Sequence, residues 1–262
     1  MLISSMLLLN AFPVFAVNES IYYEASEKLL HGKVIFIYTV EKPFDGLYDK
    51  AQTTRAEFAA VILNDLRKDV PPIAENSYFQ DCDIKDWYTS YINTLFDLKI
   101  VSGYGNDNFK PKNIVTNYEA ITMLVRCLGY EKIKTENVTY PHKYLEIAEQ
   151  LHLLENTSIS KTVDEPLTYG NMFMLLLNAM RCNISDGTQR LWDLGLESSL
   201  YKKITGKVTS VNDSEYVVTN DTESITLIWN YNENVSACVD KNVCVWFYQS
   251  DTENYVADMI VE

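Results

Sequence analysis

The side chains best suited to catalysis or metal binding are few and far apart in this sequence. The three histidines, His31, His142 and His152, have no partners at the spacing of a metal site. The sequence has no Gly-x-Ser-x-Gly elbow, no phosphate-binding loop and no Cys-x-x-Cys pair, and its Gly-Tyr-Gly stretch lacks the strand and third glycine of a dinucleotide-binding loop. We therefore predict no catalytic residue, no metal and no cofactor, and we expect that the protein is not an enzyme.

The cysteines predict little redox chemistry. Their number, five, is odd, so they cannot all pair within one chain. Cys82, Cys127 and Cys182 fall in or near predicted helices, where cysteine acts as a small apolar residue. Cys238 and Cys244 flank a five-residue stretch, which leaves two interpretations open: a bridge across a hairpin, or two free buried thiols.

Composition and charge limit the partners. The chain has 262 residues, 47% of them apolar, which is enough for one large domain or two modest ones. Its formal charge of −14 opposes nucleic acid and anionic lipid, so we predict no nucleic-acid partner. An acidic ligand would need a local basic pocket.

The first 16 residues differ in kind from the rest. They are apolar and uncharged and end in Val14-Phe15-Ala16, the small-residue pattern that precedes a signal-peptidase site. We therefore expect export, although the first basic residue is Lys28, which leaves an uncleaved anchor or a truncated start as alternatives. A membrane-spanning helix needs about 20 apolar residues, and no later stretch reaches that length, so no stable membrane span is predicted.

Residues 79–130 contain one structural unit written out in full. It begins with a Phe-x-Asp entry, Phe79 and Asp81, and an amphipathic helix is predicted from about Trp87. A structured loop from Ser102 to Val115 follows, because its glycines allow positive φ and its proline cannot continue a helix. These loop residues are Gly103, Gly105 and Pro111.

The helix after this loop begins with a predicted capping box. The Thr116 hydroxyl accepts the third free N–H of the helix, and the Glu119 carboxylate accepts the Thr116 N–H. Apolar residues then recur at helical spacing, and Gly129 is the expected stop.

Two further helix starts align with this one. The three begin at Thr54, Thr116 and Thr168, at spacings of 62 and 52 residues, and the first pairs Thr54 with Glu57. An amphipathic segment precedes each start, so a unit of helix, loop and capped helix is predicted three times. We place these units at residues 17–70, 71–132 and 133–183.

These residues resemble the S-layer homology family, whose repeats have a Phe-x-Asp-Val entry, a Trp at the first helix, a Gly-Tyr-x-Asp-Gly-x-Phe-x-Pro loop and an Ile-Thr-Arg-Ala-Glu helix start. The resemblance covers roughly residues 20–183. It implies a pseudo-threefold helical prism that attaches exported proteins to the Gram-positive cell wall by binding an anionic, often pyruvylated, secondary polysaccharide. The matching residues are Phe79, Asp81, Trp87, Gly103, Tyr104, Gly105, Asp107, Phe109, Pro111, Thr116 and Glu119.

The resemblance also implies the ligand-binding residues. In the family, the helix-start arginine and the Asp and Trp of an adjoining repeat hold the sugar. These positions correspond here to Arg55, Asp81 and Trp87, together with the loop glycines Gly103 and Gly105. A first-turn arginine at the positive helix end suits a carboxylate, and a Trp face suits a sugar ring. Structural interpretations stay open: an ion-paired or solvated arginine, an N-cap aspartate and a core tryptophan.

The units depart from the family pattern in ways that bear on binding. The first lacks the Phe-x-Asp entry and the Gly-rich loop, the second has Asn117 in place of the arginine, and the third keeps only Thr168 of the helix start. We therefore predict one surviving glycan groove, around Arg55. The alternative is a degenerate scaffold that has lost glycan binding and acts as a structural or protein-interaction module.

The composition changes after Asn183. Residues 184–203 are predicted to be a connector with a short helix, and residues 204–262 a small five-stranded barrel or sandwich with a role in protein contact but no assigned ligand. The predicted fold class is therefore α+β, an all-α bundle followed by an all-β domain. The predicted strands are Ile204–Val211, Glu215–Thr219, Ser224–Trp229, Val243–Tyr248 and Tyr255–Val261.

Overall fold

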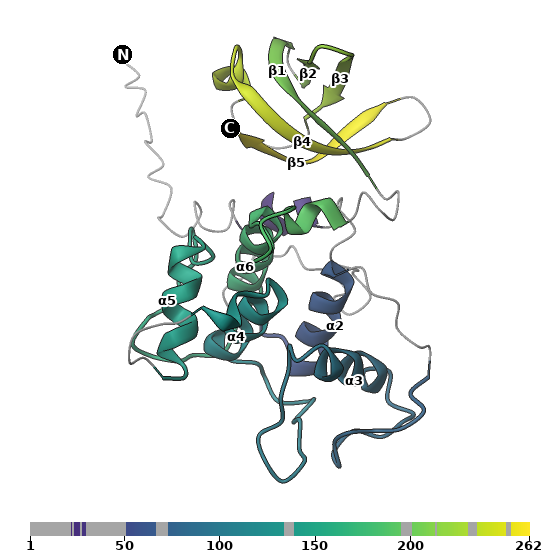
Figure 1. The fold of residues 1–262 in the computed structure, drawn as a ribbon, viewed down its shortest axis with the longest axis vertical. Helices are drawn as coiled ribbons and strands as arrows, with labels where there is room; N and C mark the ends of the chain where they lie inside the picture. The colour runs from purple at the N-terminus through teal and green to yellow at the C-terminus, as the bar shows by residue number, and fades with distance from the viewer. Residues whose placement is uncertain are drawn as a thin grey trace, which may run out of the picture.

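The computed structural model describes ten segments of the chain, in which helices come first and a β-barrel follows (Figure 1). The predicted leader, His31 and most of the residues between the first predicted helix and Thr54 lie outside these segments. No helix in the described part is long and apolar enough to cross a membrane. The described residues are 22, 24–26, 28–29, 51–66, 73–133, 139–194, 201–212, 214–229, 235–249 and 253–262.

The helical part confirms the three predicted helix starts. Thr54, Thr116 and Thr168 each stand immediately before a helix. The Thr116 cap is the predicted capping box, and Gly129 ends its helix region in the left-handed conformation with φ 81°. Described residues between positions 22 and 29 are also helical. The helices are α2 (Arg55–Asp65), α3 (Thr89–Asp97), α4 (Asn117–Cys127), α5 (His142–Gln150) and α6 (Tyr169–Arg181).

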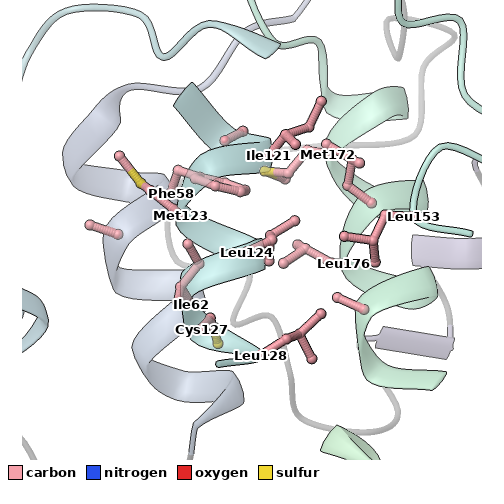
Figure 2. Packing of buried hydrophobic residues seen from close by; sticks show 14 of the residues in the cluster. Phe58, Ile62, Ile121, Met123, Leu124, Cys127, Leu128, Leu153, Met172 and Leu176 are labelled. Atoms are coloured by element: carbon pink, nitrogen blue, oxygen red, sulfur yellow. The ribbon is translucent and has the colours of Figure 1, made fainter. Parts of the chain in front are cut away.

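Helix α4 lies at the centre of the helical part, between α2 and α6 (Figure 2). Nearly all of its residues are buried, because neighbouring helices cover more than one of its faces. Figure 2 shows Phe58 and Ile62 of α2 on one side of α4 and Met172 and Leu176 of α6 on the other. This three-helix contact forms the main hydrophobic core.

The segments that lead into α2, α4 and α6 are joined in a closed cycle, which we call the cap ring (residues 51–55, 113–117 and 165–169). The first amide of each helix donates to a carbonyl three positions before the next capping threonine. This cyclic pattern is the arrangement that threefold pseudo-symmetry requires. Its bonds run from Arg55 N to Asn113 O at 2.9 Å, from Asn117 N to Glu165 O at 2.8 Å, and from Tyr169 N to Ala51 O at 2.9 Å.

The C-terminal part is a closed barrel with strand order β1-β2-β3-β5-β4, in which β3 and β5 are parallel and the other pairs antiparallel. The five predicted strands are confirmed to within two residues, and the barrel replaces the sandwich alternative. The strands are β1 (Lys202–Asn212), β2 (Glu215–Thr219), β3 (Ser224–Ile228), β4 (Asn242–Gln249) and β5 (Asn254–Val261).

Strand β4 packs in two cores at once. Val243, Val245 and Phe247 point into the barrel, whereas the alternating residues Cys244 and Trp246 belong to the core of the helical part. Such a strand is apolar on both faces, as strands covered on both sides are. All five cysteines are free, so the Cys238–Cys244 bridge is excluded.

A buried carboxylate joins the two parts. Asp258 of β5 is fully buried and accepts from the Arg181 guanidinium at 2.7 and 2.6 Å, from the Trp192 indole N–H at 3.1 Å, and lies 3.6 Å from Lys28 Nζ. Burial by itself raises the pKa of Asp258, but the Arg181 charge and hydrogen bonds, with the Lys28 charge, hold it below its usual value. Trp192 also stacks on Trp246 at 6.2 Å.

We expect Asp258→Asn to destabilise the protein by about 3 kcal/mol at neutral pH, because it takes this counter-charge away from the partly exposed Arg181 guanidinium and the buried Lys28 ammonium. A carboxylate with a lowered folded pKa stabilises above its unfolded pKa, and this contribution is lost as pH falls through the folded value. The parent and the variant should therefore converge in acid. Urea unfolding across pH measures both effects, with Asp240→Asn, which removes an exposed ion pair, as control. Equal stabilities at pH 7 would contradict the assignment.

Candidate functional site: a groove lined by arginine and tyrosine

A groove of about 410 Å³ opens between the start of α2, the α3–α4 loop, one face of α4 and the start of α5. It thus combines parts of all three predicted units. Its polar lining contains two guanidinium groups, one carboxylate and three phenols. These belong to Arg55, Arg126, Glu119, Tyr104, Tyr140 and Tyr144.

Arg55 is held on its edges and its faces. Its Nε donates to Phe109 O at 3.1 Å, its Nη2 to Ser102 O at 3.4 Å, and its Nη1 lies 3.2 Å from Glu119 Oε2. The Tyr104 and Phe109 rings lie 4.5 and 4.6 Å from its Cζ. Arg55 is only 4% exposed, and this desolvation lowers its pKa against the opposing effect of Glu119. It therefore pins the α3–α4 loop to the start of α2 while lining the groove.

Tyr104 covers this arginine. Its hydroxyl donates to Glu119 Oε1, and Lys110 Nζ lies 4.3 Å from its ring centroid. Two cations thus interact with one ring, which favours a fixed ring position. Glu119 also accepts the Thr116 N–H at 3.1 Å, so one carboxylate caps α4, pairs with Arg55 and orients Tyr104.

Arg126 forms the other charged end of the groove. Its Nε lies 3.1 Å from Glu131 Oε1, and its Nε and Nη2 donate to the Tyr144 hydroxyl at 3.2 and 3.1 Å. The Tyr144 hydroxyl donates to Glu131 at 2.8 Å. Burial, together with the Glu131 hydrogen bond, raises the pKa of Tyr144, so it stays a neutral donor. Tyr140, 59% exposed, lies edge-on to Tyr144 at 6.1 Å.

The structure separates the residues that sequence grouped around Arg55. Gly103 lines the groove, and a Cβ there would lie 2.8 Å from both Asn108 O and the Phe79 ring. Gly105 is left-handed at φ 94°. Asp81 and Trp87 do not line the groove.

Asp81 and Trp87 have other surroundings. Asp81 accepts the Phe109 and Lys110 amides at 2.9 and 2.7 Å, so it fixes the α3–α4 loop instead of capping a helix. Trp87 is 55% exposed and packs edge-on against Tyr88 and Tyr91, so it is not a core anchor.

The positions that correspond to Arg55 carry no charge. Asn117 is buried. The position in α6 that corresponds to Glu119 holds Asn171, whose Oδ1 accepts the Ser158 amide at 2.9 Å. Tyr169 takes the place of the arginine in α6, near Glu57. Among the described residues at these three helix starts, Arg55 is the cation.

Sequence reasoning missed Arg126 and the face of α4 to which it belongs. Glu119, Thr122 and Arg126 follow one another at i, i+3 and i+7 on α4, the spacing of one helix face. That pattern could have indicated a polar stripe. The approach of Tyr144 from α5 has no such local signal.

Comparison with known proteins identifies the domain to which part of the groove belongs. Residues 79–117 match the S-layer homology domain. Over 185 residues, 68% of this chain, it is 31% identical to a middle cell wall protein of Brevibacillus brevis and 27% identical to a surface layer protein of Brevibacillus choshinensis. It is also 33% identical to exoglucanase XynX of Acetivibrio thermocellus over 105 residues, 38% of this chain and 9% of that protein. The chain therefore carries an S-layer homology domain.

The similarity covers only part of these relatives. The chain spans 17% of the middle cell wall protein and 16% of the surface layer protein. The comparison thus assigns the domain and not the ligand of the groove.

We expect Asp81→Ala to loosen the α3–α4 loop, because two backbone amides lose a charged acceptor. Each such loss costs about 1–3 kcal/mol, so exchange of the Phe109 and Lys110 amide hydrogens should speed up at least about tenfold. Hydrogen exchange read by NMR measures this change. Asp81→Asn, which keeps one acceptor, should have a smaller effect, and Asp221→Ala in an exposed barrel turn should have none. Unchanged protection in Asp81→Ala would refute the role of this carboxylate.

Proposed function

We propose that the groove binds an acidic secondary polysaccharide of a Gram-positive cell wall and so anchors this exported chain at the cell surface. The observation that carries the proposal is the pair of guanidinium groups, Arg55 and Arg126, in one aromatic-lined groove. A chain with a formal charge of −14 repels polyanions in general, so these cations give local selectivity.

The groove chemistry suits a carboxylated sugar. Guanidinium groups donate paired hydrogen bonds to carboxylates such as those of a pyruvate ketal. Tyrosines offer an apolar ring face for a sugar and a hydroxyl for its polar groups. Tyr140 is exposed enough to provide that face. The S-layer homology domain and the wall and surface-layer proteins that resemble the chain are consistent with this ligand.

The proposed architecture keeps three units, at residues 17–70, 71–132 and 133–183, which together form one charged groove. The cyclic cap ring supports this division. The loss of charge at Asn117 and Tyr169 supports a single functional groove.

One observation favours the alternative of a degenerate scaffold. Both arginines already have carboxylate partners within the protein, Glu119 and Glu131. A groove whose charges are satisfied internally can serve as structure alone. Only binding experiments separate the two functions.

We expect the purified chain to sediment with Brevibacillus brevis wall sacculi and to stay in solution once the secondary polymer has been removed from them. Tyr140→Ala should lower the affinity about fivefold, because stacking of an aromatic ring contributes about 1 kcal/mol. Arg55→Ala should abolish binding, and its unfolding curve must be measured beside it, since Arg55 is buried. Tyr78→Ala is the control, because this exposed tyrosine does not line the groove. A folded Arg55→Ala protein that binds as well as the parent would contradict the proposal.

A further inference from the structure

The two carboxylates that neutralise the groove are held very differently. Glu119 is 12% exposed and is fixed by the Thr116 amide, Arg55 and the Tyr104 hydroxyl. Glu131 is 43% exposed, and the contacts described for its carboxylate are with Arg126 and the Tyr144 hydroxyl. Moving Glu119 would break a helix cap and uncover a buried guanidinium, whereas Glu131 can turn into water.

The position of Glu131 also favours its release. It lies in the short helix η1 (Tyr130–Lys132), directly after the left-handed Gly129. Glu131 does not itself line the groove, but its carboxylate contacts two residues that do, Arg126 and Tyr144. Lys143 Nζ donates to the Glu131 carbonyl at 2.6 Å and holds the backbone in place. The side chain can therefore leave without a change in the fold.

The two arginines differ in the same way. The Arg55 guanidinium is bound to two loop carbonyls and to Glu119 and lies against two aromatic rings, so it is fixed in place. The Arg126 side chain is 20% exposed, and a partner that can turn away satisfies it. A ligand carboxylate can exchange for that partner, because it offers the Arg126 guanidinium and the Tyr144 hydroxyl the same kind of acceptor as the Glu131 carboxylate.

We propose that Glu131 is a built-in competitor for Arg126, and that Arg126 is the residue that determines specificity for a carboxylate on the glycan. The ligand carboxylate takes the place of the Glu131 carboxylate on the Arg126 guanidinium and the Tyr144 hydroxyl. The sugar that carries it then lies against Tyr140. This inference rests on the proposed function. It assigns recognition of the ligand carboxylate to Arg126 and anchoring of the α3–α4 loop to Arg55.

The test uses two variants and two forms of one polymer. Glu131→Gln removes the competing charge, and Arg126→Gln removes the cation. The probes are the Brevibacillus brevis secondary wall polymer and the same polymer with its carboxylates chemically reduced to alcohols. Glu149→Gln is the matched control, because it breaks an exposed ion pair with Lys161 that lies outside the groove. Affinities are measured by calorimetry on the full chain.

We expect Glu131→Gln to bind the native polymer about threefold to fivefold more tightly than the parent, because the ligand no longer has to displace a competing carboxylate from Arg126. Arg126→Gln should bind the native polymer at least about tenfold more weakly and should no longer distinguish it from the reduced polymer. A purely structural role of the Arg126–Glu131 pair would weaken binding in both variants alike.

The outcomes separate this inference from the proposed function. If the parent binds the native polymer and neither variant changes the affinity or the preference for carboxylates, the inference fails and the proposed function stands. Binding by Glu131→Gln alone would support both, since the competitor would then mask the site. If neither the parent nor Glu131→Gln binds the native polymer, both are overturned.

Discussion

The three backbone hydrogen bonds of the cap ring determine where the other parts of the helical region lie. A capping threonine by itself fixes only the residue at which a helix begins. In the cap ring the first amide of each capped helix is also bound to the segment before the next one, so each helix start faces a loop from a different unit. Arg55 therefore meets Phe109, 54 residues further along the chain, and the groove forms between units instead of within one.

The cap ring also explains which residues differ together when the three units are compared. The cation at a helix start pairs with the third helical residue of the next capped helix, as Arg55 does with Glu119. Where the cation is replaced by Asn117, the partner position holds Asn171, so both charges are missing together. Glu57 is still a carboxylate although Tyr169 takes the place of its cation, because Glu57 accepts the Thr54 amide at 2.8 Å and so caps α2.

Local patterns were sufficient for much of the fold. The caps at Thr54, Thr116 and Thr168, the left-handed Gly129 and the five strands all depend on residues that are close in sequence, and each was predicted. Sequence did not reveal that β4 faces two cores, because its apolar run indicates a strand covered on both faces but does not show what covers the second one.

The site was harder to predict than the fold. Arg55 lines the groove, but Asp81 holds a loop and Trp87 lies outside the lining, because spacing alone does not show which side of a loop a residue faces. The pairing of Arg126 with Tyr144 depends on how α5 packs against α4, which no local signal encodes.

Helix α6 connects the groove region to the barrel. Its first residue, Tyr169, closes the cap ring, and its last, Arg181, holds the buried Asp258 of β5. The expected connector at residues 184–203 includes the fully buried Trp192, which packs between the helices and Trp246. The barrel thus shares a core with the helices, and one continuous helix lies between the Asp258 contact and the cap ring. The barrel therefore packs against the part of the chain that carries the groove through a core that both parts share.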